Sequence, residues 1–288
     1  MSNNKSQHSA VSYIMLIGGC FFMTSRVLMA LVATLCTWGL TALGAAAVVF
    51  FRSPNGKIMN FCLGFAAGVM IAASFWSLLS PAIERVEMQG GAVPPYAVAA
   101  AGFLTGAVFM WASDKIVSRA RIRAEESRGV RENRSRMAML MLSITLHNIP
   151  EGLAVGVAFG TLASVADTES IMGAVTLAMG IGLQNFPEGA AVSLPMRREG
   201  CSRARSFFYG QVSGMVEPIA GVLGALLVVC VEAVLPFALS FAAGAMILVA
   251  VHELIPECQR NTEELPYFAT MGIILGFTVM MMLDVMLG

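Results

Sequence analysis

Long apolar segments alternate with short polar islands along this 288-residue chain, a pattern typical of helices embedded in a membrane. A helix needs about 20 residues to cross the ~30 Å hydrocarbon core of a bilayer. The pattern therefore predicts an all-α integral membrane protein, an eight-helix transmembrane bundle. Its spans cover residues 27–51, 58–80, 95–112, 137–160, 170–194, 205–231, 235–256 and 267–287.

The head of the chain stands apart from this pattern. Residues 11–23 are apolar but too few to cross a bilayer. They could form an interfacial segment, a signal-like stretch or an extension without a role, and the single Lys5 ahead of them argues against a signal peptide. We treat residues 1–26 as an N-terminal extension and residues 27–288 as one transmembrane domain.

The composition agrees with a membrane protein. Hydrophobic residues make up 57% of the chain, charged residues make up 12%, and the mean hydropathy is +0.75, whereas soluble domains carry about 25% charge. The net charge is zero and no basic patch is interleaved with aromatics, so no nucleic-acid partner is expected. The six cysteines show neither zinc-finger spacing nor a disulfide framework.

Lys and Arg are distributed unevenly between the loops. Fifteen of the 18 fall in alternate loops on one side, and eight of these lie in the 113–136 loop. The positive-inside rule makes this a cytoplasmic basic loop and places both termini on the non-cytoplasmic side. We interpret it as a solvated loop rather than a lipid- or nucleic-acid-binding segment. We expect the plasma membrane as host, with an internal organelle membrane as the alternative.

A short string in the second predicted span recurs in the seventh. Residues 65–71 read Phe-Ala-Ala-Gly-Val-Met-Ile, and residues 241–247 read Phe-Ala-Ala-Gly-Ala-Met-Ile. Spans five apart cross the membrane in opposite directions, so the chain is predicted to contain an inverted repeat, spans 1–3 and 6–8, around a central pair, spans 4 and 5. A fainter match relates residues 44–49 to 224–229. The alternative is that these are simply small-residue packing strings.

Two near-copies of a polar signature lie inside the central pair. Residues 147–152 read His-Asn-Ile-Pro-Glu-Gly, and residues 184–189 read Gln-Asn-Phe-Pro-Glu-Gly. In each, the first residue and the glutamate are four apart, so a helix places them on one face. His147 falls about 15 Å into its span, near the midplane. The prolines free backbone carbonyls beside the carboxylates.

A third intramembrane carboxylate, Glu217, is also followed by proline. A lone histidine in a membrane is often a packing group, and a lone glutamate can bond to a neighbouring backbone. Three uncompensated carboxylates, however, would cost on the order of 8–10 kcal/mol at about 3 each. Imidazole suits transition metals, whereas magnesium and calcium prefer all-oxygen shells. These residues therefore predict a transition-metal site that binds reversibly.

The doubled hexapeptide resembles the signature of the ZIP (Zrt/Irt-like) metal transporters, and residues 184–194 and 210–218 resemble its GufA-type branch. The likeness runs from about residue 37 to 288. It implies eight spans and transport of zinc toward the cytoplasm, with Cd²⁺, Fe²⁺, Mn²⁺ and Cu²⁺ as further candidate substrates. It also implies alternating access, in which spans 1, 4, 5 and 6 move against spans 2, 3, 7 and 8. A homodimer is implied by the family alone.

The resemblance also assigns ligands at a binuclear site. One metal would be held by Met70, His147, Glu151, Gln184 and Glu188. The other metal would share Glu151 and Glu188 with the first and would add Asn148, Asn185 and Glu217. The chain departs from the family in two ways. Some relatives carry Asp where this chain has Asn185, so the second metal site has less negative charge here. The 113–136 loop lacks the His-rich stretch of many relatives.

Four further residues are candidates for a metal pathway. His252 and Glu253 lie in the seventh span, where they could continue a path from the site to one face. Glu84 and Asp284 lie near the non-cytoplasmic ends of the second and eighth spans, where they could attract cations. An ordinary interfacial charge is an equal alternative for each.

Two rival functions come from other classes. An intramembrane metallohydrolase would need an open metal position and a general base, but no His-Glu-x-x-His motif occurs and the chain has three histidines. A metal-responsive receptor would be expected to carry an appended soluble domain. We therefore expect a transporter that is not an enzyme, needs no catalytic cofactor and takes zinc as its substrate.

Overall fold

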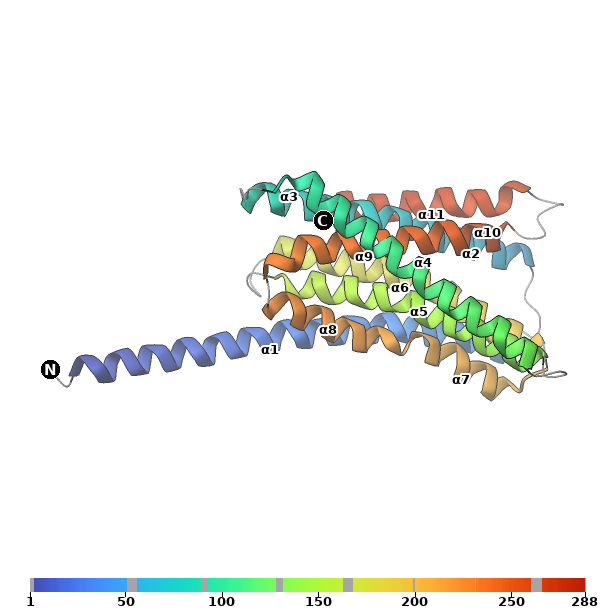
Figure 1. Cartoon of the computed structure of the whole chain (residues 1–288), viewed down its shortest axis with the longest axis horizontal. Coiled ribbons are helices and arrows are strands. Elements are labelled where there is room, and N and C mark those ends of the chain that lie inside the picture. Colours follow the sequence, from blue (N-terminus) through green and yellow to red (C-terminus); the bar gives the residue numbers. More distant parts are fainter. Residues whose placement is uncertain are drawn as a thin grey trace.

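The computed structural model describes residues 3–50, 56–89, 93–127, 132–162, 168–198, 200–230, 232–259 and 266–287. Within these ranges the regular structure is helical and contains no strand, which confirms the all-α class. Figure 1 shows the helices lengthwise in one bundle, with the start of α1 extending beyond it. Because α1 begins at Asn3, the predicted N-terminal extension runs into the first span as one helix.

The helices follow one another with short breaks. In chain order they are α1 (Asn3–Ala45), η1 (Ala46–Val49), α2 (Gly56–Ala73), η2 (Ser74–Leu79), α3 (Ser80–Gln89), α4 (Pro95–Ser127), α5 (Glu132–Gly160), α6 (Thr168–Arg198), α7 (Arg203–Gly214), α8 (Val216–Cys230), η3 (Glu232–Val234), α9 (Leu235–Val249), η4 (Ala250–Leu254), α10 (Ile255–Cys258) and α11 (Pro266–Leu287).

Six helical stretches in the described residues are long and apolar enough to cross a membrane, so a multi-pass membrane protein is confirmed. They correspond to the first, second, third, sixth, seventh and eighth predicted spans. Their bounds are Thr24–Val49, Gly56–Met88, Pro95–Arg119, Arg203–Val229, Leu235–Cys258 and Tyr267–Leu287.

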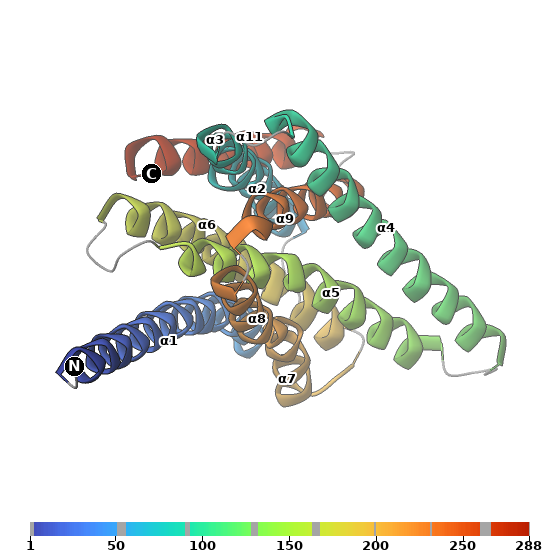
Figure 2. The ribbon, with the colours of Figure 1, turned by 60° about the vertical axis from the view of Figure 1, so that its left-hand side comes forward.

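The predicted central pair, α5 and α6, is not among these six stretches. The polar signature of α6 and the charged residues at its ends lower its apolar content, whereas the first part of α5 lies outside the residues whose side chains the structure describes. Figures 1 and 2 show where they lie: α5 and α6 run between α1 and α8 on one side and α2 and α9 on the other. Neighbouring helices therefore cover the polar faces of this pair.

The third predicted span is longer than expected. Its helix, α4, continues to Ser127, and α5 begins at Glu132, so most of the predicted 113–136 loop is helical. The reason lies in the local sequence, because residues 119–126 are rich in Arg, Ala and Glu, which favour helix. The basic region is thus largely an extension of two helices.

Glycines bring α2 and α11 into backbone contact. Gly68 of α2 packs against the carbonyl oxygen of Ile273, and Gly276 of α11 packs against the carbonyl oxygen of Phe65, with no room for a Cβ at either glycine. In a membrane the hydrophobic effect does not drive helices together, so van der Waals contacts between closely packed backbones stabilise the pair.

The α4–α9 pair shows the same arrangement. Gly244 of α9 packs against the carbonyl oxygen of Phe103, and Gly106 of α4 packs against that of Phe241, again without room for a Cβ. Gly244 belongs to the repeated 241–247 string, as Gly68 belongs to the 65–71 string. The two short strings therefore occupy equivalent packing positions against different partner helices.

A π-helical turn follows each of these strings. The π-helix η2 begins at Ser74, and η4 begins at Ala250, each nine residues after the phenylalanine that opens its string. Such turns widen the helix locally and occur frequently at functional sites. Both turns interrupt a helix that packs against the central pair.

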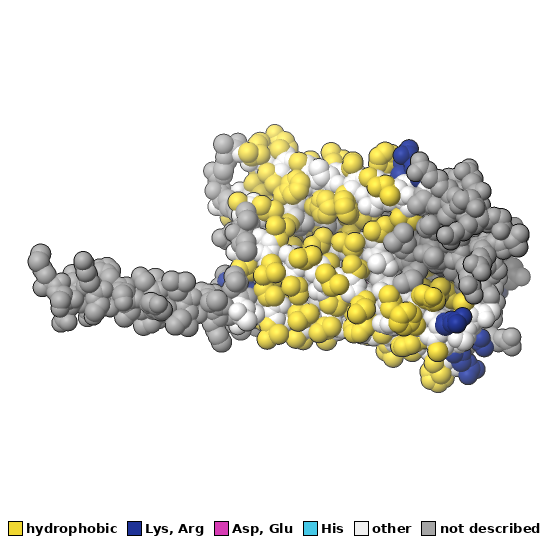
Figure 3. Space-filling view, turned by 60° about the horizontal axis from the view of Figure 1, so that its bottom comes forward, with side chains coloured by type: hydrophobic (Ala, Val, Ile, Leu, Met, Phe, Trp, Pro, Cys, Tyr) yellow, Lys and Arg dark blue, Asp and Glu magenta, His cyan; other side chains and the backbone are white. Residues whose placement is uncertain are grey.

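The flank of the bundle is apolar. Figure 3 shows hydrophobic side chains covering the visible side, with most of the visible Lys and Arg side chains at one end. Among the described residues, exposed large side chains include Leu43, Leu104, Ile219 and Val285. A soluble protein rarely exposes such a continuous apolar surface, whereas a bilayer requires it.

Candidate metal-binding site

Seven of the predicted ligands are buried polar side chains in the middle of the bundle. They come from three helices: α5, α6 and α8. Each is at most 7% exposed: His147, Asn148, Glu151, Gln184, Asn185, Glu188 and Glu217. The eighth, Met70 of α2, is fully buried within the apolar core. The prolines of the two signatures lie within continuous helices, as predicted.

The two central helices are joined by a short hydrogen bond between their signatures. Nε2 of Gln184 donates to Oε1 of Glu151 across 2.6 Å. The remaining oxygens of this pair, Oε2 of Glu151 and Oε1 of Gln184, are buried without a partner. A buried oxygen without a donor is costly, and contact with a cation would satisfy such an oxygen.

The carboxylates of the three helices form one cluster. Glu151 interacts electrostatically with Glu188 and Glu217, and Glu188 also interacts with Glu253. Like charges this close in a low-dielectric interior repel each other strongly. The cluster is therefore arranged to be stabilised by positive charge.

Glu217 is held by donors that the sequence analysis missed. Thr37 donates to Oε2 across 2.6 Å, Thr41 donates to Oε1 across 3.3 Å, and Nδ2 of Asn185 donates to Oε2 across 2.8 Å. Both threonines lie on α1 and are buried. Their spacing of four along an otherwise apolar span was the available signal, because it places two hydroxyls on one helix face.

The two asparagines of the signatures make similar contacts. Nδ2 of Asn148 donates to the carbonyl oxygen of Ser213 across 2.9 Å, and Nδ2 of Asn185 also approaches the carbonyl oxygen of Thr37, at 3.3 Å. In both side chains Oδ1 is buried without a partner. Each asparagine thus anchors its helix through nitrogen and leaves its oxygen for another group.

Of the four candidate pathway residues, the structure brings Glu253 to the cluster. Its Oε1 lies 2.6 Å from Nε2 of His147. His252 is exposed on the outer surface, so it does not line the same interior route. Asp284 is buried and accepts a hydrogen bond from Ser77 across 2.6 Å, and Glu84 is exposed and accepts one from Ser80 across 2.9 Å.

The cluster is not a finished coordination shell. Among the side chains the structure describes, no group of three His, Cys, Asp or Glu residues is close enough to hold one metal ion. In the described contacts His147 faces Glu253 instead of the other predicted ligands. The amides and the thioether, moreover, are ligand types outside that group. Loading a metal at His147 would require this side chain to turn away from Glu253.

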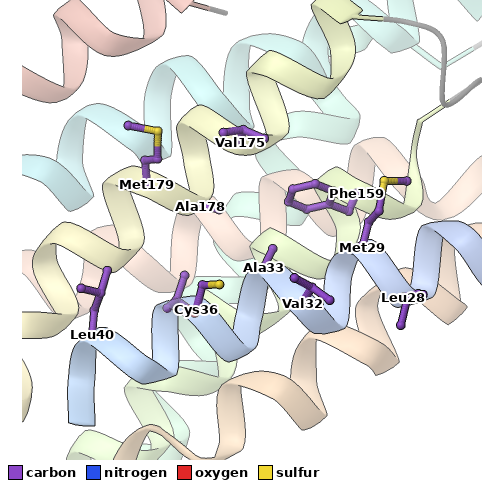
Figure 4. Close-up of a pocket in the computed structure, with 11 residues that line it drawn as sticks. Leu28, Met29, Val32, Ala33, Cys36, Leu40, Phe159, Val175, Ala178 and Met179 are labelled. Carbon is purple, nitrogen blue, oxygen red and sulfur yellow. The ribbon is translucent and has the colours of Figure 1, made fainter. Parts of the chain in front are cut away.

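An apolar cavity of about 520 Å³ lies beside this cluster, between α1, α5 and α6. Figure 4 shows its wall, which includes Ala33, Cys36 and Leu40 of α1 together with Phe159 of α5. Thr37 also lines it. The lining offers almost no oxygen or nitrogen, so the cavity is no alternative site for a metal ion.

A multi-pass helical bundle with buried carboxylates at its centre defines a polytopic membrane protein with an interior polar site. The family model described as ZIP zinc transporter matches residues 119–284. The chain belongs to this ZIP family. Because the family is one of transporters, the prediction that the chain is not an enzyme is confirmed.

Several named relatives are similar over most of their length. The chain is 40% identical to zinc transporter ZIP11 of Homo sapiens, over 92% of this chain and 98% of the relative. It is 38% identical to zinc transporter GufA of Myxococcus xanthus, over 90% and 98%. It is 34% identical to zinc transporter ZIPB of Bordetella bronchiseptica, over 86% and 78%.

Proposed function

We propose that this protein transports zinc across a membrane toward the cytoplasm, using the buried cluster of α5, α6 and α8 as the cargo site. The observation that carries the proposal is the Glu151–Gln184 pair, which leaves two buried oxygens without a partner in the middle of a membrane protein. The names of the similar relatives, all zinc transporters, indicate the cargo.

The ligands divide into two groups in this proposal. One ion is held by Met70, His147, Glu151, Gln184 and Glu188. A second ion shares the carboxylates of α5 and α6 and adds the oxygens of Asn148 and Asn185 with Glu217. The unpartnered oxygens of both asparagines support this assignment. Mixed nitrogen, oxygen and sulfur ligands suit a transition metal that must be released again.

The proposed architecture is eight spans with an inverted repeat. The described elements group into eight long helical rods once η1, η2, α3, α8, η3, η4 and α10 are joined to their neighbours. Two sets of contacts support the repeat: α2 packs on α11 as α9 packs on α4, through glycines of the repeated strings, and the π-helical turns occur at the same offset. Repeats of this kind underlie many transporters.

In these contacts the repeat relates residues 176 apart, as Phe65 and Phe241 are. The fainter match between residues 44–49 and 224–229 is offset by 180, one helical turn more. The repeat that we propose therefore rests on the 65–71 and 241–247 strings and their packing. The fainter match is a recurrence of small residues in helices that also pack closely.

Alternating access follows from this arrangement. We propose that α1, α5, α6, α7 and α8 carry the metal as one block against the remaining helices. The close contacts of α1 with α6 and of α5 with α8 support one block, and those of α2 with α11 and of α4 with α9 support the other. The contact between His147 of α5 and Glu253 of η4 joins the two blocks.

Isotopic zinc uptake into proteoliposomes tests the function. Glu188→Ala and His147→Ala should abolish uptake while the purified proteins keep the unfolding temperature and elution volume of the unmodified chain. Glu87→Ala, which removes an exposed carboxylate of α3 outside the cluster, is the matched control and should transport normally. Normal uptake by both cluster variants would contradict the proposal.

A competition assay measures selectivity. Unlabelled Cd²⁺, Fe²⁺, Mn²⁺ and Cu²⁺ are added to the same uptake assay, and the ions that share the site reduce zinc uptake. The plasma membrane as host, both termini on the non-cytoplasmic side, and a homodimer stay predictions.

A further inference from the structure

Glu217 is the most heavily hydrogen-bonded carboxylate of the cluster. Thr37, Thr41 and Asn185 donate to its two oxygens. The hydroxyl of Thr37 has a second acceptor within reach, the carbonyl oxygen of Thr34 at 3.0 Å, but the carboxylate oxygen of Glu217 is closer, at 2.6 Å. Two of the three donors therefore come from α1, a helix without any proposed metal ligand.

The packing of the two signatures shows that Thr41 of α1 and Glu217 of α8 occupy equivalent positions. Gly152, at the end of the first signature, packs against the backbone of Glu217. Gly189, at the end of the second signature, packs in the same way against the carbonyl oxygen of Thr41. Thr41 and Glu217 are thus equivalent positions on α1 and α8, and they are 176 residues apart, like the two repeated strings.

The asparagines of the signatures give the same correspondence one turn earlier. Asn148 donates to the carbonyl oxygen of Ser213, and Asn185 donates to that of Thr37. Ser213 and Thr37 are also 176 residues apart. Around the cluster, α1 therefore mirrors the end of α7 and the start of α8, except that a threonine hydroxyl stands where α8 carries the Glu217 carboxylate.

We propose that Thr37 and Thr41 are positioning residues of the cargo site, which hold the Glu217 carboxylate in place and give the α1 side a neutral hydroxyl pair. This inference rests on the proposed function and deepens it. The threonines act through Glu217 rather than on the metal itself. Their loss would let the Glu217 side chain rotate, and the ion would lose a ligand of fixed geometry.

The surroundings of Thr37 allow a clean substitution. Its side chain is buried, but it also lines the apolar cavity between α1, α5 and α6. Valine has nearly the same shape, and its additional methyl group can face the apolar wall that Ala33 and Leu40 provide (Figure 4). Thr37→Val therefore removes the hydrogen bond with little change in packing.

The test measures zinc uptake as a function of zinc concentration in proteoliposomes that contain the full chain. Thr37→Val should raise KM on the order of tenfold, as expected for a lost bond to a charged acceptor. Thr41→Val should raise it by about threefold, because its 3.3 Å bond is longer. Vmax should stay within about twofold, because the ligands themselves are unchanged.

Two further variants separate positioning from a purely structural role. Thr37→Ser keeps the hydroxyl and should restore KM to that of the unmodified chain. Thr34→Val is the matched control: Thr34 is a buried threonine one turn away that donates to carbonyl oxygens of its own helix, Ala30 and Leu31, and its loss should leave KM unchanged.

The outcomes are distinguishable. An unchanged KM in folded Thr37→Val, or no rescue by Thr37→Ser, would overturn the positioning role while zinc transport stands. A KM raised equally by Thr34→Val would also overturn it, since packing of α1 would then explain the effect. Absence of zinc uptake by the unmodified protein would overturn the proposed function and this inference with it.

Discussion

His147 of α5 and Glu253 of η4 meet at 2.6 Å, Nε2 to Oε1, across the boundary between the two proposed blocks of helices. This contact joins a predicted metal ligand to a helix that carries none of the other predicted ligands. An imidazole nitrogen that faces a carboxylate cannot at the same time bind a metal. In the proposed mechanism, zinc at this nitrogen would displace Glu253, so that cargo binding would depend on the relative position of the two blocks.

Removal of the competing carboxylate should strengthen zinc binding at equilibrium. Glu253→Ala frees Nε2 of His147, and a bond to a charged group contributes about 1.5–3 kcal/mol. We expect zinc affinity in detergent to rise by at least about tenfold, measured by competition with a fluorescent chelator. Glu257→Ala, an exposed carboxylate on the next helix, is the control. A lower affinity in Glu253→Ala would show that Glu253 ligates zinc directly.

Acid should weaken zinc binding. The ligand set contains carboxylates and an imidazole, and these must be deprotonated to coordinate a metal, so binding releases protons. Apparent affinity should fall steadily as the pH decreases from neutral, because protons compete with the metal for these ligands. Calorimetry in two buffers of different ionisation enthalpy measures the number of protons released. Zinc binding without proton release would argue against these ligands.

Glycine contacts should dominate the stability of the bundle. Gly68→Ala and Gly244→Ala each place a methyl group against a backbone carbonyl oxygen, where no side chain can move aside. We expect a loss of about 1–3 kcal/mol for each, the usual cost of overpacking, seen as a lower Tm in detergent.

The matched control for these glycines lies on α1. Gly39→Ala introduces the same methyl group at a position where nothing lies within 4 Å. It should leave Tm unchanged or raise it slightly, because alanine favours helix more than glycine does. An equal loss in all three variants would contradict the packing argument.

Single cysteines should report the orientation of the chain. In a background without native cysteines, Arg205→Cys on the basic end should react with a membrane-impermeant maleimide only after the cells are permeabilised. Tyr96→Cys, at the start of α4 and 74% exposed, should react in intact cells. The reverse labelling pattern would place the basic loops outside the cytoplasm.

Much of the cluster followed from local sequence. A helix brings residues four apart onto one face, so the pairing of His147 with Glu151 and of Gln184 with Glu188 needed no tertiary structure. The cost of carboxylates in hydrocarbon indicated that they face the interior, and all three are buried. The same cost explains why other helices cover α5 and α6, which carry two of these carboxylates.

Other features depended on which helices meet. Neighbours in sequence can differ completely in environment: His252 is exposed while Glu253 reaches His147, because adjacent residues of a helix point in different directions and η4 is widened by a π-helical turn. The sequence around His252 and Glu253 therefore gave no means to decide which of the two side chains faces the cluster.

The sequence by itself determined the membrane class, the apolar spans and the buried acidic signatures, because periodicity and the energetics of transfer into hydrocarbon act on each segment separately. Only the tertiary structure decided that Thr37 and Thr41 hold Glu217 and that Glu253 opposes His147. These contacts join residues more than a hundred positions apart, and no local pattern encodes which distant helix will supply the partner.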